Sequence, residues 1–145
     1  MSFIAVGDIH GCAQTLDVLL KHLSPGADDH LVFVGDYVDR GPDSKGVIDR
    51  LLALREEVHC TFLRGNHEAL MLSYLSGGDA NLWWANGGVA TLRSYGSNGT
   101  SQEIPASHVE FIRGTQLYLD TPDFFFVHAG LKPNLTIAKN LARYG

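Results

Sequence analysis

The chain has 145 residues, of which 45% are hydrophobic and 19% are charged, and its formal net charge is -5. This length fits one domain with a substantial core, and the negative charge argues against a nucleic-acid backbone or an anionic membrane as a partner. No stretch approaches the roughly 18 apolar residues of a membrane span. The two cysteines, Cys12 and Cys60, follow no secretory leader, so we expect no disulfide framework and a cytoplasmic location.

Strands and helices alternate in the first half of the chain. Short apolar runs predict buried strands, whereas Leu16, Leu19, Leu20 and Leu23 recur at helical spacing. The predicted order is strand 3–8, a helix after residue 12, strand 30–36, a helix opened by residues 42–44, strand 58–65 and a helix over 66–75. This alternation predicts an α/β fold with a parallel sheet and right-handed crossovers.

The second half of the chain has a different pattern. Residues 77–100 are rich in Gly, Asn and Ser around short helical pieces, which indicates an inserted, substrate-facing segment. Pro105 opens a short helix, and the apolar runs 117–120 and 124–130 flank a turn, which predicts a β-hairpin. We expect residues 1–145 to form a single domain.

Polar side chains follow the end of each of the three early strands. The sequences are GDIHG at 7–11, GDYVDRG at 35–41 and RGNHE at 64–68. Ligands of open α/β sheets bind beyond the carboxyl ends of the strands. Alone, each motif fits a turn, a helix cap or a surface ion pair. Three such motifs at one rim predict a shared metal or phosphate site.

The residue types at this rim suit metal-centred phosphate chemistry. Asp and His offer oxygen and nitrogen ligands to Mn, Fe or Zn, one carboxylate can bridge two ions, and Arg matches phosphate with paired N–H donors. His128 follows the apolar run 123–127, so we expect it to join the same rim. Four other histidines are interpreted as helix-surface or segment-edge residues without a role in the site: His22, His30, His59 and His108.

These motifs, together with FVHAG at 126–130, resemble the signature motifs of the phosphoprotein phosphatase family of Ser/Thr phosphatases. WWANGG at 83–88 and TLRSYG at 91–96 resemble its small bacterial and phage branch. The resemblance runs from residue 3 to about residue 133. It implies the α/β fold of calcineurin-like metallophosphoesterases, a sandwich of two mixed β-sheets flanked by helices.

The resemblance also implies roles for individual residues. Two divalent metal ions, Mn in preference to Fe or Zn, would be held by a set in which Asp36 bridges both: Asp8, His10, Asp36, Asn66 and His128. A metal-activated water would attack the phosphorus. His67 would be the general acid for the leaving oxygen, and Asp39 would orient it. Three side chains would hold the phosphoryl oxygens: Arg40, Arg64 and Asn66.

The chain departs from the family pattern near its C-terminal end. Family members continue past the His-Ala-Gly motif with a further phosphate-binding arginine and a last histidine ligand, whereas no histidine follows His128 here. The resemblance therefore predicts a chain that lacks the C-terminal part of the fold and has an incomplete second sheet. The hairpin at 117–128 would then keep an open apolar edge, which favours self-association.

Three functions stay open at this point. The leading one is hydrolysis of phosphoserine and phosphothreonine in a phosphoprotein or phosphopeptide partner. The first alternative is a symmetrical bis(5'-nucleosyl)-tetraphosphatase, whose second motif resembles GDLVARG and lacks the aspartate found here at position 39. The second alternative is a truncated fragment that binds metal and phosphate with weak or no turnover. The sequence predicts neither the physiological substrate nor the oligomeric state.

Overall fold

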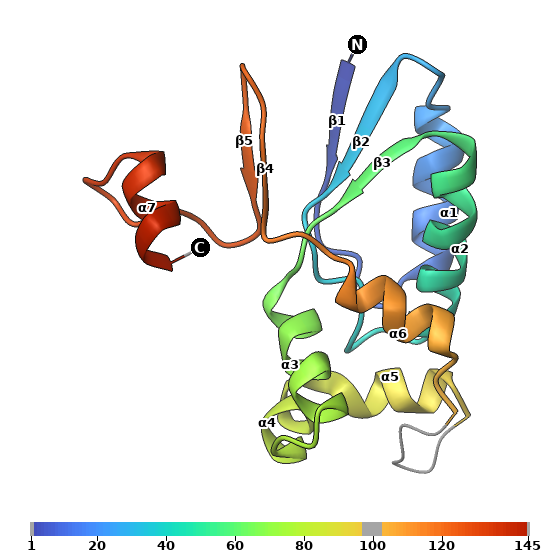
Figure 1. Ribbon diagram of the computed structural model, residues 1–145. Coiled ribbons are helices and arrows are strands. Elements are labelled where there is room, and N and C mark those ends of the chain that lie inside the picture. The colour runs from blue at the N-terminus through green and yellow to red at the C-terminus, as the bar shows by residue number, and fades with distance from the viewer. Residues whose placement is uncertain (1, 97–102, 145) are drawn as a thin grey trace.

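The computed structural model describes residues 2–96 and 103–144 of the protein. Strands β1 (Ser2–Val6), β2 (Asp29–Phe33) and β3 (His59–Phe62) form a parallel sheet in the order β1-β2-β3 (Figure 1). The predicted strand–helix–strand alternation is confirmed. Because the strands are parallel, their carboxyl ends share one rim, and the three polar motifs follow from that rim.

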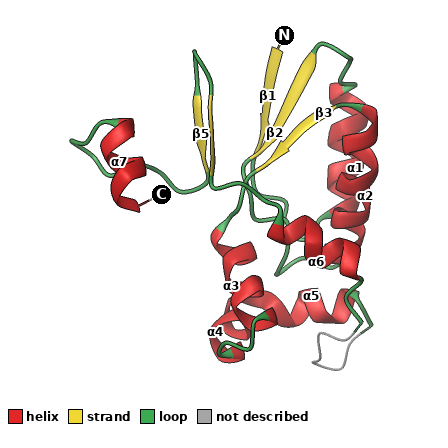
Figure 2. Ribbon diagram, viewed as in Figure 1, coloured by secondary structure: helices red, strands yellow, loops and turns green. Residues whose placement is uncertain are grey.

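Two helices cover one face of this sheet, as Figure 2 shows. Helix α1 (Ala13–Leu23) buries Leu16 and Leu20 of the four leucines at helical spacing, whereas Leu19 is exposed. Helix α2 (Ser44–Glu57) buries Val47, Ile48, Leu51 and Leu54, and the buried residues of both helices belong to one core with Leu31 and Phe33 of β2. The Asp43 side chain caps α2 by accepting from the Gly46 N–H. Across residues 2–96 and 103–144, no helix combines the length and the apolar character that a membrane crossing requires.

A layer of short helices lies beyond the carboxyl ends of the strands (Figure 1). It comprises α3 (Asn66–Leu75), α4 (Ala80–Trp83), the kinked turn η1 (Trp84–Gly88) and α5 (Val89–Ser94). The last three elements form most of the predicted inserted segment, of which residues 97–100 lie outside the described residues. Gly87 has φ 102°, and a Cβ there would lie 2.7 Å from Arg40 Cγ, so the turn needs glycine where it meets the second motif.

The C-terminal third forms the predicted hairpin. Helix α6 (Ala106–Arg113) leads into β4 (Tyr118–Asp120) and β5 (Phe125–Val127), which pair antiparallel. The hairpin lies on the sheet face opposite α1 and α2, where the Phe3 ring contacts Phe124 and Phe126. Among the described residues the first sheet is wholly parallel and the second is a two-stranded antiparallel pair without further strands. Helix α7 (Ile137–Tyr144) was not predicted.

Two histidines that the sequence placed at surfaces or edges are buried. His30 is 6% exposed, and its Nε2 lies 2.7 Å from Thr61 Oγ1. His108 is 3% exposed and lies between two partners, accepting from the Tyr95 hydroxyl and donating to the Asp49 carboxylate. Hydrophobic periodicity does not reveal such pairs, because each partner lies 13 to 59 residues away in the chain.

The two cysteines differ in their surroundings. Cys12 is exposed and is the residue that precedes α1. Cys60 is partly buried in β3, and burial, with a smaller contribution from Glu57, raises the pKa of its thiol to about 11. No disulfide joins them, since both are free thiols.

Candidate metal centre

The loops that follow β1 and β2 are joined by backbone hydrogen bonds. The N–H groups of Ile9 and His10 both donate to the Asp36 carbonyl, at 3.0 and 2.9 Å. His10, Asp36, Asp39 and Arg40 all have positive φ, and they are four of the six non-glycine residues with this conformation in the described chain. Left-handed conformations cost free energy and persist where the surroundings fix them, which is common at functional sites. This clustering marks the rim as the functional region.

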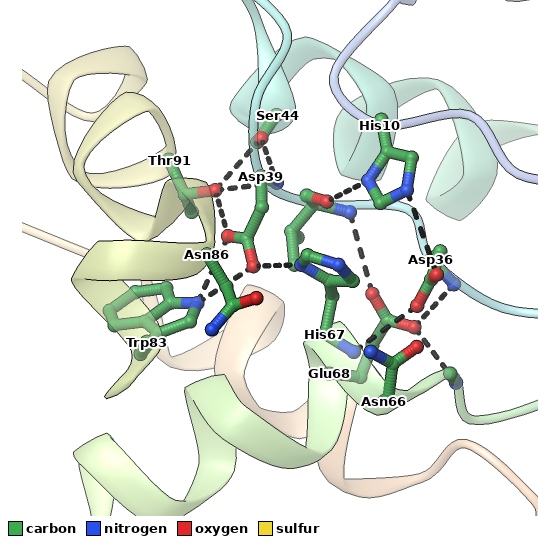
Figure 3. Close-up of polar contacts among 12 residues, drawn as sticks. His10, Asp36, Asp39, Ser44, Asn66, His67, Glu68, Trp83, Asn86 and Thr91 are labelled. Carbon is green, nitrogen blue, oxygen red and sulfur yellow. Dashed lines mark hydrogen bonds and ion pairs between the residues drawn. The ribbon is translucent and has the colours of Figure 1, made fainter. Parts of the chain in front are cut away.

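A buried carboxylate fixes the loops after β2 and β3 to each other. Glu68 is fully buried and accepts from the backbone N–H groups of Asp36 (2.6 Å), Tyr37 (2.9 Å) and Gly65 (2.9 Å). Burial raises the pKa of Glu68, and these backbone hydrogen bonds oppose the rise. Figure 3 shows Glu68 beneath the Asp36 side of the site. Glu68 therefore has a structural role, because it holds two motif loops together.

Two histidines of the rim are held in one orientation by backbone carbonyls. Nδ1 of His10 lies 2.9 Å from the Val38 carbonyl, and Nδ1 of His128 lies 2.8 Å from the Val34 carbonyl. A carbonyl oxygen can only accept, so each Nδ1 carries the proton. In the neutral imidazole, Nε2 then presents a lone pair, which is how metal-binding histidines are usually supported.

These lone pairs meet the carboxylate and amide oxygens at one point. Asp36 Oδ2 lies 3.6 Å from His10 Nε2 and 3.3 Å from His128 Nε2. Asp8 Oδ2 lies 3.8 Å from His10 Nε2, and Asn66 Oδ1 lies 3.1 Å from His128 Nε2. With neutral imidazoles, all five atoms are acceptors, and a set of oxygen and nitrogen acceptors at this spacing can bind a metal cation. The structure thus brings together all five residues that the sequence predicted as metal ligands.

His67 and Asp39 form a buried pair beside this cluster. His67 Nδ1 lies 2.7 Å from Asp39 Oδ2, and both side chains are almost fully buried. The His67 ring meets the His10 ring edge-on, with 4.6 Å between centroids. His67, His10 and Asp36 also have possible ligand atoms within 4.8 Å of one another. The sequence predicted a proton donor at His67 and missed that it is also close enough to be a metal ligand.

The Asp39 carboxylate is surrounded by donors that the sequence did not indicate. Trp83 Nε1 donates to both carboxylate oxygens, at 3.0 and 2.9 Å, and the Thr91 hydroxyl donates to Oδ1 at 2.7 Å (Figure 3). Burial raises the pKa of Asp39, and the hydrogen bonds from Thr91, His67 and Trp83 oppose this. Trp83 and Thr91 lie 44 and 52 residues from Asp39, so no local pattern reveals them.

The two predicted phosphate-binding arginines are placed differently. Arg40 is exposed, and its backbone N–H donates to the Gly87 carbonyl at 3.2 Å. The Arg64 guanidinium instead donates to the Arg113 carbonyl at the end of α6, and to the hydroxyl and carbonyl of Thr115. Carbonyls at a helix C-terminus need donors and attract cations, which explains this position. The Arg64 guanidinium is therefore held at the end of α6, whereas Arg40 lies in the loop after β2 and meets the η1 turn at Gly87.

Residues 1–143 match the family model described as calcineurin-like phosphoesterase. The chain belongs to this family. Calcineurin-like phosphoesterases use divalent metal ions, and the acceptor atoms clustered around Asp36 are oxygen and nitrogen atoms of the types that ligate such ions. The family match confirms the fold implied by the resemblance, although among the described residues one sheet is parallel and the other antiparallel, and neither is mixed.

Relatives within the family carry two different names. The chain is 45% identical over 84 residues to serine/threonine-protein phosphatase 1 of Salmonella typhimurium, which covers 57% of this chain and 37% of that protein. It is 34% identical over 147 residues to a symmetrical bis(5'-nucleosyl)-tetraphosphatase of Pseudomonas entomophila, covering 97% and 47%. A crystal structure described as a candidate diadenosine tetraphosphatase superposes with a TM-score of 0.71 at 30% identity, covering 94% and 54%. The chain spans about half the length of these proteins, or less.

Proposed function

We propose that this chain hydrolyses phosphomonoesters of serine and threonine in proteins, at a centre of two divalent metal ions. One observation carries the proposal: the acceptor cluster on Asp36 adjoins a His67–Asp39 pair that can supply a proton. Mn is the leading candidate for both ions, with Fe or Zn as alternatives. One ion would bind Asp8, His10 and Asp36, and the other would bind Asp36, Asn66 and His128.

Each protein group would have a distinct part in the reaction. When bound, the metal ions would polarise the phosphate and lower the pKa of a water molecule. His67 would donate its Nε2 proton to the leaving oxygen, and Asp39 would orient the ring by accepting from the Nδ1–H. Arg40 would hold phosphoryl oxygens with paired N–H donors. Asn66 would contact both the second ion and the phosphate.

Asp39 supports a protein phosphatase over the tetraphosphatase alternative. The second motif here is GDYVDRG, whereas that of the symmetrical tetraphosphatases resembles GDLVARG and has no carboxylate at this position. An alkoxide leaving group needs a proton, and an oriented imidazole supplies it. The second candidate keeps support of its own, because relatives named as tetraphosphatases align with 91% to 99% of the chain, against 57% for relatives named as serine/threonine phosphatases.

The test compares substrates at saturating Mn. A phosphoserine peptide, a phosphotyrosine peptide and diadenosine tetraphosphate are each incubated with the full chain, with a chelator as control, and product release is measured. We expect the phosphoserine peptide to be the preferred substrate by kcat/KM. Faster hydrolysis of diadenosine tetraphosphate would replace the proposal with its alternative. If the chain binds Mn but releases product from none of these substrates, the alternative of a metal-binding fragment without turnover replaces the proposal.

A further inference from the structure

The Asp39 carboxylate is enclosed by two helices that belong to no predicted catalytic motif. It is 0% exposed, and so are Trp83 at the end of α4 and Thr91 in α5. In Figure 3 these two side chains approach Asp39 from one side and His67 approaches it from the other. Two side chains of the inserted segment therefore contact the carboxylate that pairs with His67.

We propose that Trp83 and Thr91 are positioning residues for the His67 proton donor, which they align by fixing the Asp39 carboxylate. The inference rests on the proposed function, because it assigns His67 the role of donating a proton to the leaving oxygen. It adds two residues from the inserted segment to the residues on which that step depends.

The hydrogen-bond pattern leaves the carboxylate one orientation. The Trp83 N–H lies between the two oxygens, at 3.0 Å from Oδ1 and 2.9 Å from Oδ2. The Thr91 hydroxyl takes Oδ1, so Oδ2 is the oxygen that faces His67 Nδ1 at 2.7 Å. Loss of either donor would free the carboxylate to rotate about its Cβ–Cγ bond.

The direction of the Thr91 hydroxyl is also determined. Its oxygen accepts from the Asp39 backbone N–H at 2.8 Å, and it lies 3.0 Å from the Ser44 hydroxyl. Thr91 has one proton, and Asp39 Oδ1 is an acceptor only, so that proton points to Oδ1. Ser44 therefore donates to Thr91, and the three groups form a directed chain that ends on the carboxylate.

The Trp83 indole is held in place by its neighbours. Gly88 passes directly over the ring, since a Cβ at Gly88 would lie 2.5 Å from Trp83 Cδ2. The Tyr74 ring lies 4.9 Å away on centroids. A packed indole with its N–H engaged is a rigid donor, which suits a positioning role.

The proposal predicts a dependence on the leaving group. A serine alkoxide is a poor leaving group that requires the His67 proton, whereas 2,4-dinitrophenolate leaves without one. Loss of the Trp83 N–H or of the Thr91 hydroxyl should therefore slow hydrolysis of a phosphoserine peptide and leave the rate on 2,4-dinitrophenyl phosphate nearly unchanged. Mn binding should not change, because neither residue contacts the acceptor cluster.

The experiment measures kcat and KM for both substrates in full-length Trp83→Phe, Thr91→Val and Thr91→Ser variants. Trp84→Phe is the matched control, since Trp84 is exposed and the side chains that bond to the Asp39 carboxylate are His67, Trp83 and Thr91. We expect Trp83→Phe and Thr91→Val to lower kcat for the peptide about 10- to 100-fold at unchanged KM, and to alter kcat for the dinitrophenyl ester less than about 3-fold. Thr91→Ser should restore the rate, and Trp84→Phe should match the wild type.

Two results would overturn the inference: equal losses on both substrates, or a loss of Mn affinity. If Trp83→Phe fails to fold, the inference is tested by comparing Thr91→Val with Thr91→Ser. If the wild type hydrolyses neither substrate, the proposed function fails. The positioning role is then tested separately by proton NMR of the His67 ring. Its Nδ1–H signal, assigned with His67→Asn, should be protected from exchange in wild type and Trp84→Phe but broadened in Trp83→Phe and Thr91→Val. An unchanged signal in the latter two refutes the positioning role.

Discussion

Asp36 and Asp39 are buried aspartates three residues apart in one loop, and they have opposite surroundings. Both have positive φ, 57° and 78°. Asp39 meets donors at each oxygen, from His67, Trp83 and Thr91. Asp36 Oδ1 accepts from the His67 N–H, but its Oδ2 faces imidazole Nε2 atoms at 3.3 and 3.6 Å. Hydrogen-bond donors of the protein satisfy both oxygens of Asp39, whereas the surroundings of Asp36 Oδ2 favour a bound cation.

This contrast separates two kinds of buried carboxylate on one rim. A buried charge is stable only when donors or ions compensate it. Since the backbone conformation is similar at both positions, the difference comes from what surrounds each side chain. Substitutions at the two positions should therefore have different consequences for metal binding, and the predictions below test that difference in order of decreasing effect.

The largest effect is expected from Asp36→Asn. The amide keeps the shape and removes the charge that the two metal ions would share. We expect phosphate release to fall more than about 1,000-fold. The rise in Tm that Mn gives the wild type should also disappear, because stabilisation by a ligand requires binding. Phosphate assay and thermal unfolding with and without Mn measure the two effects, and a retained Tm shift would contradict the role of Asp36.

His67→Asn should reduce turnover while leaving the metal ions bound. We expect a loss of about 100- to 1,000-fold on a phosphoserine peptide, which is the usual contribution of a general acid. Because His67 also lies close enough to be a ligand, Mn affinity is measured on the same variant. A large loss of affinity would reassign His67 from proton donor to metal ligand.

Much of the fold and most of the metal centre could be predicted from the sequence, because the residues concerned lie close to strand ends along the chain. Asp8, Asp36 and Asn66 each follow a strand within a few residues, so a parallel sheet brings them together. The donors to Asp39 come from 44 and 52 residues away and carry no periodic signal. Arg64 was predicted to bind phosphate, but its guanidinium bonds to groups at 113–115, which sequence spacing does not reveal.

Glu68→Gln should lower stability without removing a ligand. One carboxylate oxygen would become an amide N–H₂ that faces the backbone donors of Asp36, Tyr37 or Gly65. We expect the free energy of unfolding to fall by about 3 kcal/mol. Glu110→Gln on the exposed side of α6 is the control and should stay within about 0.5 kcal/mol of wild type. Urea denaturation measures both, and equal stabilities would show that Glu68 does not hold the loops.

The smallest effect concerns histidines away from the rim. His30 stacks on His59 with 3.7 Å between ring centroids, and burial, then the charge of His59, lowers the pKa of His30. Below about pH 6.5 the unfolded chain then binds more protons than the folded one, so stability falls as the pH drops. His59→Gln should reduce this loss between about pH 7 and pH 5.5 by less than about 1 kcal/mol. Urea midpoints at both pH values test it, and Mn affinity should be unchanged.

The most direct test of the central contrast is a calorimetric titration of Mn into the wild type, Asp36→Asn and Asp39→Asn under identical conditions. We predict that the wild type and Asp39→Asn bind Mn with affinities within about 3-fold of each other, and that Asp36→Asn shows no binding in the same range. Asp39 would be part of the metal centre, and the contrast would be wrong, if both variants lost Mn equally or if Asp36→Asn bound Mn like the wild type.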